Sequence, residues 1–182
     1  MKAMFAAGLS ALLFVGGINS GFAQDKKADQ QAKVNASAEE VLQEFYKMEG
    51  ARALFDRAAG YAIFEVTKAG LGASGAGGNG VAVNKATGQR TYMRMGSAGV
   101  GFTFGLSRYD IVILFENAAK LDAFTKGGWD SAATAQAAAG TSGAQVASSF
   151  FDGVAYYQIG RRGLMASADV SGTRFWYADE LN

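Results

Sequence analysis

The arrangement of apolar and small residues is most regular between Val100 and Leu106, where bulky side chains alternate with glycine or threonine. Successive side chains of a strand point to opposite faces, so Val100, Phe102, Phe104 and Leu106 share one bulky face. The other face is nearly bare, which lets a ligand or another strand approach the backbone, or lets the sheet bend. The pattern predicts a curved sheet, with Val100, Phe102 and Phe104 as candidate apolar contacts for a ligand.

Before residue 60, the apolar residues recur at the spacing of an α-helix, which predicts helices in this part of the chain. Ser37-Ala38-Glu39-Glu40 is a capping-box pattern, so a helix is expected to start at Ser37. Apolar residues at helical spacing form one stripe from Val41 to Met48. Gly50 interrupts this helix, and a second short helix is expected over 51–59, closed by Gly60.

From Gly60 onward the apolar pattern has the period of a β-strand. The glycine-rich residues 75–80 are expected to form a turn or flexible link, and residues 84–88 a hairpin turn with Gly88 at positive φ. Residues 111–115 are apolar on both faces, which predicts a central strand. The expected strands are 61–66, 69–75, 80–84, 90–95, 99–107, 111–115, 154–159, 164–171 and 173–177.

One helix is inserted into this β pattern. Asn117 is expected to cap a helix that runs to Lys126, with Leu121 and Phe124 facing inward and Gly127 at its end. The predicted fold class is therefore α+β, with N-terminal helices packed on a curved, barrel-like antiparallel β-sheet with one inserted helix.

The N-terminal residues 1–23 have the pattern of a signal peptide. Lys2 precedes an apolar stretch, and small residues at Gly21 and Ala23 mark a cleavage site. The apolar stretch is shorter than the roughly 20 residues of a membrane-spanning helix. Residues 24–36 are polar and are expected to form a flexible leader or a frayed helix start, before a single domain over 37–182. We therefore expect an exported protein, periplasmic or peripherally associated with the cell envelope.

The composition narrows the possible functions. The chain has 17 Lys and Arg against 16 Asp and Glu, which argues against nucleic acid as a partner. It has no histidine or cysteine, which removes Ser-His-Asp and thiol catalysis and ordinary zinc, haem and blue-copper sites. We therefore expect no cofactor, no metal and no enzymatic activity.

A pair of carboxylates is the catalytic arrangement that this composition still allows, because glycosidases use such a pair. The interior candidates are Glu65, Asp110, Glu116 and Asp152. Carboxylates at strand ends are usually solvated or salt-bridged, and that is the simpler interpretation here.

Three basic residues are candidates for binding an anionic head group. Arg161 and Arg162 precede Gly163 in an expected turn between two strands. Two solvated arginines in a turn are the ordinary interpretation, but arginine also makes bidentate contacts with phosphate. Lys68 joins these arginines only if the fold brings their loops together.

Several short segments in a fixed order resemble the SYLF domain family. They are Ala62-Ile63-Phe64, the run from Val66 to Gly72, Ala98-Gly99-Val100-Gly101, Ile113-Leu114-Phe115, Leu121 and Phe124 before Gly128-Trp129, Gly163-Leu164-Met165-Ala166, and Ser171-Gly172. The resemblance covers about Glu40 to Tyr177. That family includes small exported bacterial proteins and eukaryotic members that bind phosphoinositides and actin. The resemblance implies a lipid-binding, non-enzymatic domain.

The leading hypothesis is therefore a non-enzymatic binder of phospholipid, a membrane surface or another amphiphile in the bacterial cell envelope. The apolar strand face would hold acyl chains, and Lys68, Arg161 and Arg162 the head group. The alternative is a structural or protein-interaction module with an envelope protein as partner and no small-molecule ligand. An outer-membrane barrel is a third class, disfavoured because its strands need about 9–11 residues and the predicted runs are mostly shorter.

Overall fold

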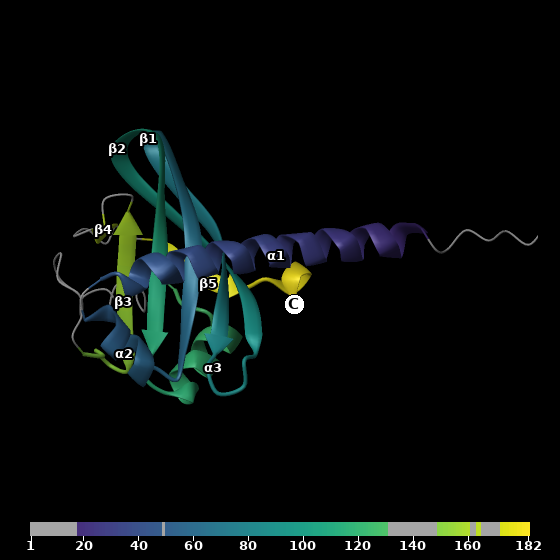
Figure 1. The fold of residues 1–182 in the computed structure, drawn as a ribbon. Coiled ribbons are helices and arrows are strands. Elements are labelled where there is room, and N and C mark those ends of the chain that lie inside the picture. Colours follow the sequence, from purple (N-terminus) through teal and green to yellow (C-terminus); the bar gives the residue numbers. More distant parts are fainter. Residues whose placement is uncertain (1–17, 49, 131–148, 161–162, 165–171) are drawn as a thin grey trace, which may run out of the picture.

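The computed structural model describes residues 18–48, 50–130, 149–160, 163–164 and 172–182 (Figure 1). Helices flank an antiparallel sheet, so the predicted α+β class is confirmed. The elements are α1 (Ile18–Tyr46), α2 (Ala51–Arg57), β1 (Gly60–Asn84), β2 (Arg90–Phe115), α3 (Ala118–Gly127), β3 (Val154–Gly160), β4 (Gly163–Leu164), β5 (Thr173–Tyr177) and the short 3-10 helix η1 (Asp179–Leu181).

Two long strands, β1 and β2, form one continuous hairpin, with backbone pairs from Gly60↔Phe115 to Val83↔Arg90. Its turn has the predicted chemistry, because Asn84 Oδ1 accepts hydrogen bonds from the backbone of Ala86 and Thr87 and Gly88 has a φ of 71°. The prediction of separate short strands here was wrong. Residues 75–80 are not a link either, because they pair with β2 as part of β1.

Close approach explains two of the glycines in β1. A Cβ on Gly78 would lie 2.4 Å from the backbone oxygen of Glu65, and a Cβ on Gly80 would lie 2.4 Å from that of Ile63. The second half of β1 therefore crosses back over its first half, and the whole hairpin folds in two. We call its bend, residues 69–77 and 96–106, the arch; it stands at the top of Figure 1, opposite α2 and α3.

The remaining strands extend both halves of the folded hairpin. β3 pairs with the second half of β2, from Tyr109↔Gly160 to Phe115↔Val154, and β4 pairs with β3. β5 pairs with the first half of β2, from Met93↔Tyr177 to Ser97↔Thr173. No pairing among the described strands joins the two ends of the sheet. The predicted barrel-like closure is therefore not seen in the described part of the chain, although the folded hairpin does curve the sheet.

The sheet carries a core on each face, because alternate residues of its strands point to opposite sides. Val112 and Leu114 pack with α1 and α2, whereas Ile111, Ile113 and Phe115 pack with α3. All five residues are buried, which confirms residues 111–115 as a central strand. Asn117 caps α3 by accepting from the Lys120 backbone, as predicted, and Leu121 and Phe124 are buried.

Helix α1 is longer than predicted. It begins at Ile18 rather than at Ser37, and Ser37 Oγ donates to Glu65 Oε2 at 2.8 Å instead of capping the helix. Residues 24–36 are accordingly helical. Their contacts give the reason, since Gln31 Nε2 donates to the Leu181 backbone oxygen at 2.7 Å and Asn35 Nδ2 to the Tyr92 hydroxyl at 3.0 Å. The N-terminal part of α1 projects beyond the sheet (Figure 1).

Candidate functional site

The arch is the first candidate site, because it contains the predicted apolar residues. Val100 pairs with Ala73, and Phe104 pairs with Leu71. Phe102 lies in β2 at the register shift between Leu71 and Ala73. The side chains of Val100, Phe102 and Phe104 lie outside the described residues. The backbone therefore brings these three positions together at the bend of the hairpin.

Leu106 ends this segment and is the most exposed large apolar side chain among the described residues, at 68% of its full exposure. The preceding residue, Gly105, has a φ of 104°, which L side chains rarely adopt. The sequence placed Leu106 on the bulky strand face but gave no sign of its exposure. Exposure depends on the arch standing clear of the helices, and that is a property of the folded hairpin.

Basic residues flank the arch on the body of the sheet. Lys68 pairs with Ser107 across the hairpin and is partly buried, and the next residue of β2, Arg108, is exposed. Arg161 and Arg162 lie outside the described residues. The positions on either side of them, Gly160 and Gly163, pair with each other. Gly160 also pairs with Tyr109 of β2, and Tyr109 pairs with Val66 of β1. Lys68 follows Val66 by two residues, so the positions that flank Arg161 and Arg162 lie at the same end of the sheet as Lys68.

A groove of about 1030 Å³ runs between α1 and the sheet below the arch. Its apolar part is formed by Val41, Met48 and Ile159, and charged side chains surround it. The charged residues along it are Lys33, Glu40, Glu44, Lys47, Glu65, Arg108 and Asp110. The groove is thus a mixed surface with both signs of charge, and it was not predicted, because it forms only where α1 packs against distant residues of β1, β2 and β3.

Two of the predicted carboxylates meet in this groove. Glu65 and Asp110 are direct cross-strand partners on β1 and β2. Burial, and secondarily the Glu65 charge, raise the pKa of Asp110 from its ordinary 3.8 to about 6. Like charges placed directly opposite each other on a sheet repel, so this pair destabilises the hairpin at pH values where Asp110 is ionised.

The other two carboxylates are elsewhere. Asp152 forms a 3.0 Å ion pair with Lys120 of α3, and the backbone of Glu116 donates to Gly153. Both lie at the end of the sheet away from the arch. The fold therefore does not gather the four predicted acidic residues into one site. In the part of the chain that the structure describes, no three His, Cys, Asp or Glu side chains cluster as a metal site.

Within the described ranges, no helix combines the length and the apolar character needed to span a bilayer.

Comparison with known proteins gives two matches. Residues 96–182, which begin at the arch, match the family model described as "Ysc84: Las17-binding protein actin regulator". The chain is also 39% identical over 149 residues to a protein named "Beta cell expansion factor A" from Aeromonas veronii. That alignment covers 81% of this chain and 57% of the relative, so the chain spans little more than half the length of that protein.

Proposed function

The chain belongs to the Ysc84 (SYLF) family, and on that premise we propose that it is a non-enzymatic protein that binds phospholipid or another amphiphile. Neither the family description nor the name of the relative points to an enzymatic activity. The proposed place of action is the bacterial cell envelope, on the strength of the signal-peptide pattern in residues 1–23.

The observation that carries this proposal is the exposure of Leu106 at the end of the arch, beside basic residues. Moving a leucine side chain from water into hydrocarbon is favourable by about 1.5–3 kcal/mol. A Lys or Arg near an anionic membrane surface adds about 1 kcal/mol. An arch that enters the interface with Leu106, while Lys68 and Arg108 stay at head-group level, combines both contributions.

The positions of Val100, Phe102 and Phe104 in the same bend support the proposal. Their residue types are those that insert favourably into the acyl region of a bilayer. Arg161 and Arg162 are proposed as further head-group contacts, because the neighbouring Gly160 lies at the same end of the sheet as Lys68. The proposed membrane-facing surface is therefore the arch end of the molecule.

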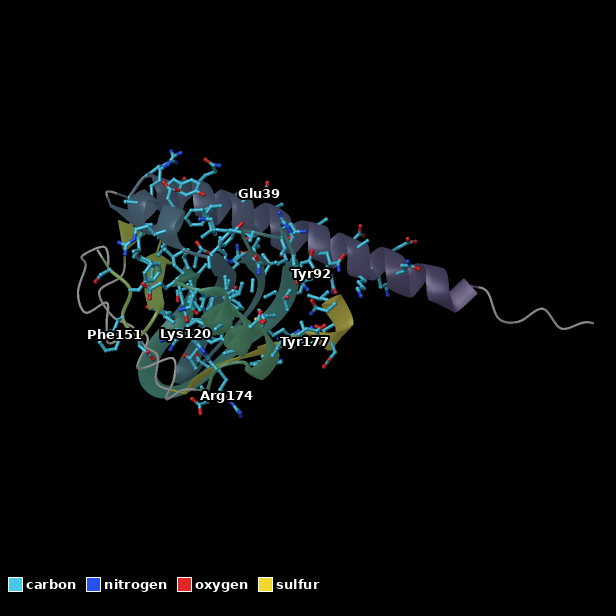
Figure 2. The ribbon with its side chains drawn as sticks, turned by 90° about the horizontal axis from the view of Figure 1, so that it is seen from below. Glu39, Tyr92, Lys120, Phe151, Arg174 and Tyr177 are labelled. Atoms are coloured by element: carbon cyan, nitrogen blue, oxygen red, sulfur yellow. The ribbon has the colours of Figure 1, made fainter. Side chains whose placement is uncertain are left out.

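Co-sedimentation with vesicles tests this proposal. The Leu106→Ser variant is expected to bind phosphatidylcholine–phosphatidylglycerol vesicles roughly ten-fold more weakly than the unchanged protein, because it loses the transfer energy of one leucine. Phe151→Ser is the matched control, since Phe151 is also exposed, at 48%, but lies beside Lys120 at the other end of the sheet (Figure 2). Equal binding by the two variants would refute the arch as the binding surface.

A further inference from the structure

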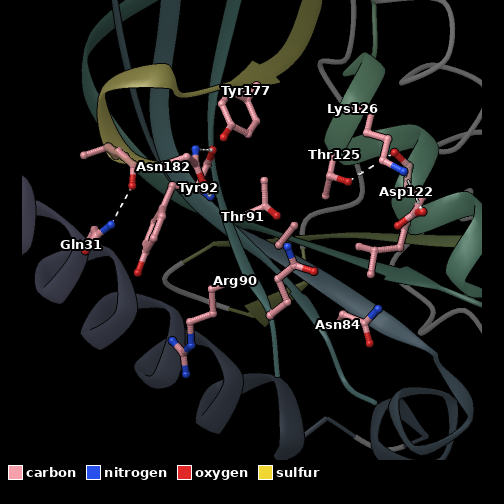
Figure 3. Close-up of a pocket in the computed structure, with 14 residues that line it drawn as sticks. Gln31, Asn84, Arg90, Thr91, Tyr92, Asp122, Thr125, Lys126, Tyr177 and Asn182 are labelled. Atoms are coloured by element: carbon pink, nitrogen blue, oxygen red, sulfur yellow. Dashed lines mark hydrogen bonds and ion pairs between the residues drawn. The ribbon is translucent and has the colours of Figure 1, made fainter. Parts of the chain in front are cut away.

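A second pocket, far from the arch, lies between the β1–β2 turn, α3 and the C-terminal segment. Its volume is about 560 Å³, within the range of small-molecule sites in proteins. Figure 3 shows Thr91 and Tyr177 on one side of it and Asp122, Thr125 and Lys126 of α3 on the other. The pocket sits where the long hairpin ends, so it shares no residue with the arch.

The charged side chains of this pocket are already paired within the protein. Lys126 Nζ lies 3.0 Å from Asp122 Oδ2. Arg90 donates to Asn35 Oδ1 at 2.7 Å and lies 3.9 Å from Glu39. Each cation of the pocket thus has a carboxylate beside it, which offsets its attraction for an anionic ligand and favours an uncharged one.

The neutral polar groups of the pocket, in contrast, are available. In the described part of the chain, the hydroxyls of Thr91 and Tyr177 and the carboxamide of Gln89 have no hydrogen-bond partner. Asn84 uses its Oδ1 for the hairpin turn, which leaves its NH₂ as a donor. These groups offer both donors and acceptors within one concave surface.

The ring of Tyr177 adds an aromatic surface to this polar set. It is 42% exposed although it belongs to a paired residue of β5. A tyrosine presents a broad apolar face together with a polar hydroxyl, which suits a ligand with the same mixture. Sugar rings have this character, since hydroxyls surround an apolar face of C–H groups.

From the paired charges, the available hydroxyl and amide groups and the exposed ring, we propose that this pocket binds a neutral saccharide. The ring of Tyr177 packs against the sugar face, and Thr91, Gln89 and Asn84 bind its hydroxyls. This site is independent of the proposed membrane surface. Vesicle binding and sugar binding can therefore fail separately.

The neighbouring residue, Trp176, supplies a matched control. Trp176 has a similar exposure, 45%, but strand alternation places it in a different groove, beside Lys33 and Met95. Replacing Trp176 by leucine removes an exposed aromatic ring of the same strand without changing the saccharide pocket.

The experiment is an NMR titration of the ¹⁵N-labelled protein with maltotriose, cellotriose and triacetylchitotriose, and separately with inorganic phosphate. At least one trisaccharide is expected to cause saturable shifts around Thr91 and Tyr177 below about 20 mM. Tyr177→Leu and the isosteric Thr91→Val should each weaken that binding roughly five-fold or more, and Trp176→Leu should leave it unchanged.

Three results would overturn the proposal. One is that none of the three sugars causes saturable shifts in the unchanged protein. This test does not depend on the folding of any variant. Another is that inorganic phosphate alone binds at this pocket, because the site would then be anionic in specificity. The third is an equal loss of sugar binding in Trp176→Leu and Tyr177→Leu.

Discussion

The carboxamide of Asn182 pairs with both backbone groups of Tyr92. Its Oδ1 accepts from the Tyr92 backbone N–H at 2.8 Å, and its Nδ2 donates to the Tyr92 carbonyl at 2.7 Å. The Ala178 backbone N–H also donates to the Tyr92 carbonyl, so this backbone group and the Asn182 side chain together continue the hydrogen bonding of β5 along β2. The same segment holds α1, through the hydrogen bond from Gln31 to Leu181.

We predict that Asn182→Ala destabilises the protein by about 1–3 kcal/mol, because the backbone of Tyr92 loses two partly buried hydrogen bonds. Asn182→Asp should also destabilise, because an oxygen would replace the Nδ2 donor that faces the carbonyl oxygens of Tyr92 and Ala178. Urea unfolding followed by circular dichroism measures the difference. A midpoint unchanged from that of the parent protein would show that the pairing contributes no stability.

The cross-strand pair of Glu65 and Asp110 predicts an unusual dependence of stability on pH. The raised pKa of Asp110 means that the folded state binds more protons than the unfolded state between pH 3.8 and about 6. The contribution of Asp110 is therefore most favourable below pH 3.8 and is lost as the pH rises through about 6.

Asp110→Asn removes this cost, so it should stabilise the protein by about 1–2 kcal/mol at pH 7 and much less at pH 4. Asp122→Asn is the control, because Asp122 is an exposed carboxylate paired with Lys126. Denaturant unfolding at both pH values gives the comparison. A gain for Asp110→Asn that is the same at pH 4 and pH 7 would contradict the assignment.

Close packing within the folded hairpin predicts a large effect at Gly80. Gly80→Ala places a Cβ 2.3 Å from Phe64 and 2.4 Å from the backbone oxygen of Ile63, so a loss of about 3 kcal/mol or more is expected. Gly127→Ala is the matched control, since a Cβ there meets nothing within 4 Å. Thermal unfolding of the two variants tests this. Similar melting temperatures would mean that β1 does not cross itself at Gly80.

The contrast between Gly80 and Gly88 explains what the sequence could and could not predict. Gly88 serves a local turn, and its neighbours from Asn84 onward already indicate that turn. Gly80 serves a contact with Ile63 across the fold of the same strand, and no local pattern distinguishes that from a flexible glycine. Local signals likewise predicted the cap at Asn117.

Less of the candidate sites than of the fold could be predicted, because both sites depend on contacts between residues that are distant in the sequence. Alternation placed Leu106 on the bulky strand face, but its exposure results from the bend of the hairpin. The saccharide pocket needs Thr91 and Tyr177, which β2 and β5 bring together from distant parts of the chain. Long-range pairing, rather than residue type, creates both surfaces.

Charge should modulate binding to the membrane surface through Arg108. Arg108→Gln is expected to weaken binding to anionic vesicles roughly five-fold at low salt, because one cation at the surface contributes about 1 kcal/mol. Binding to purely zwitterionic vesicles should not change. Arg57→Gln on α2, at the opposite end of the molecule, is the control (Figure 1). An equal loss of vesicle binding in Arg108→Gln and Arg57→Gln would show that Arg108 is not part of the membrane-binding surface.

The absence of cysteine allows a direct test of membrane contact by the arch. Leu106→Cys and Phe151→Cys each introduce a single thiol that can carry an environment-sensitive fluorophore. On addition of phosphatidylcholine–phosphatidylglycerol vesicles, the label at position 106 should shift to shorter wavelength and become protected from aqueous iodide, while the label at 151 stays in water. Protection at 151 without protection at 106, or no change at either, would contradict membrane binding through the arch.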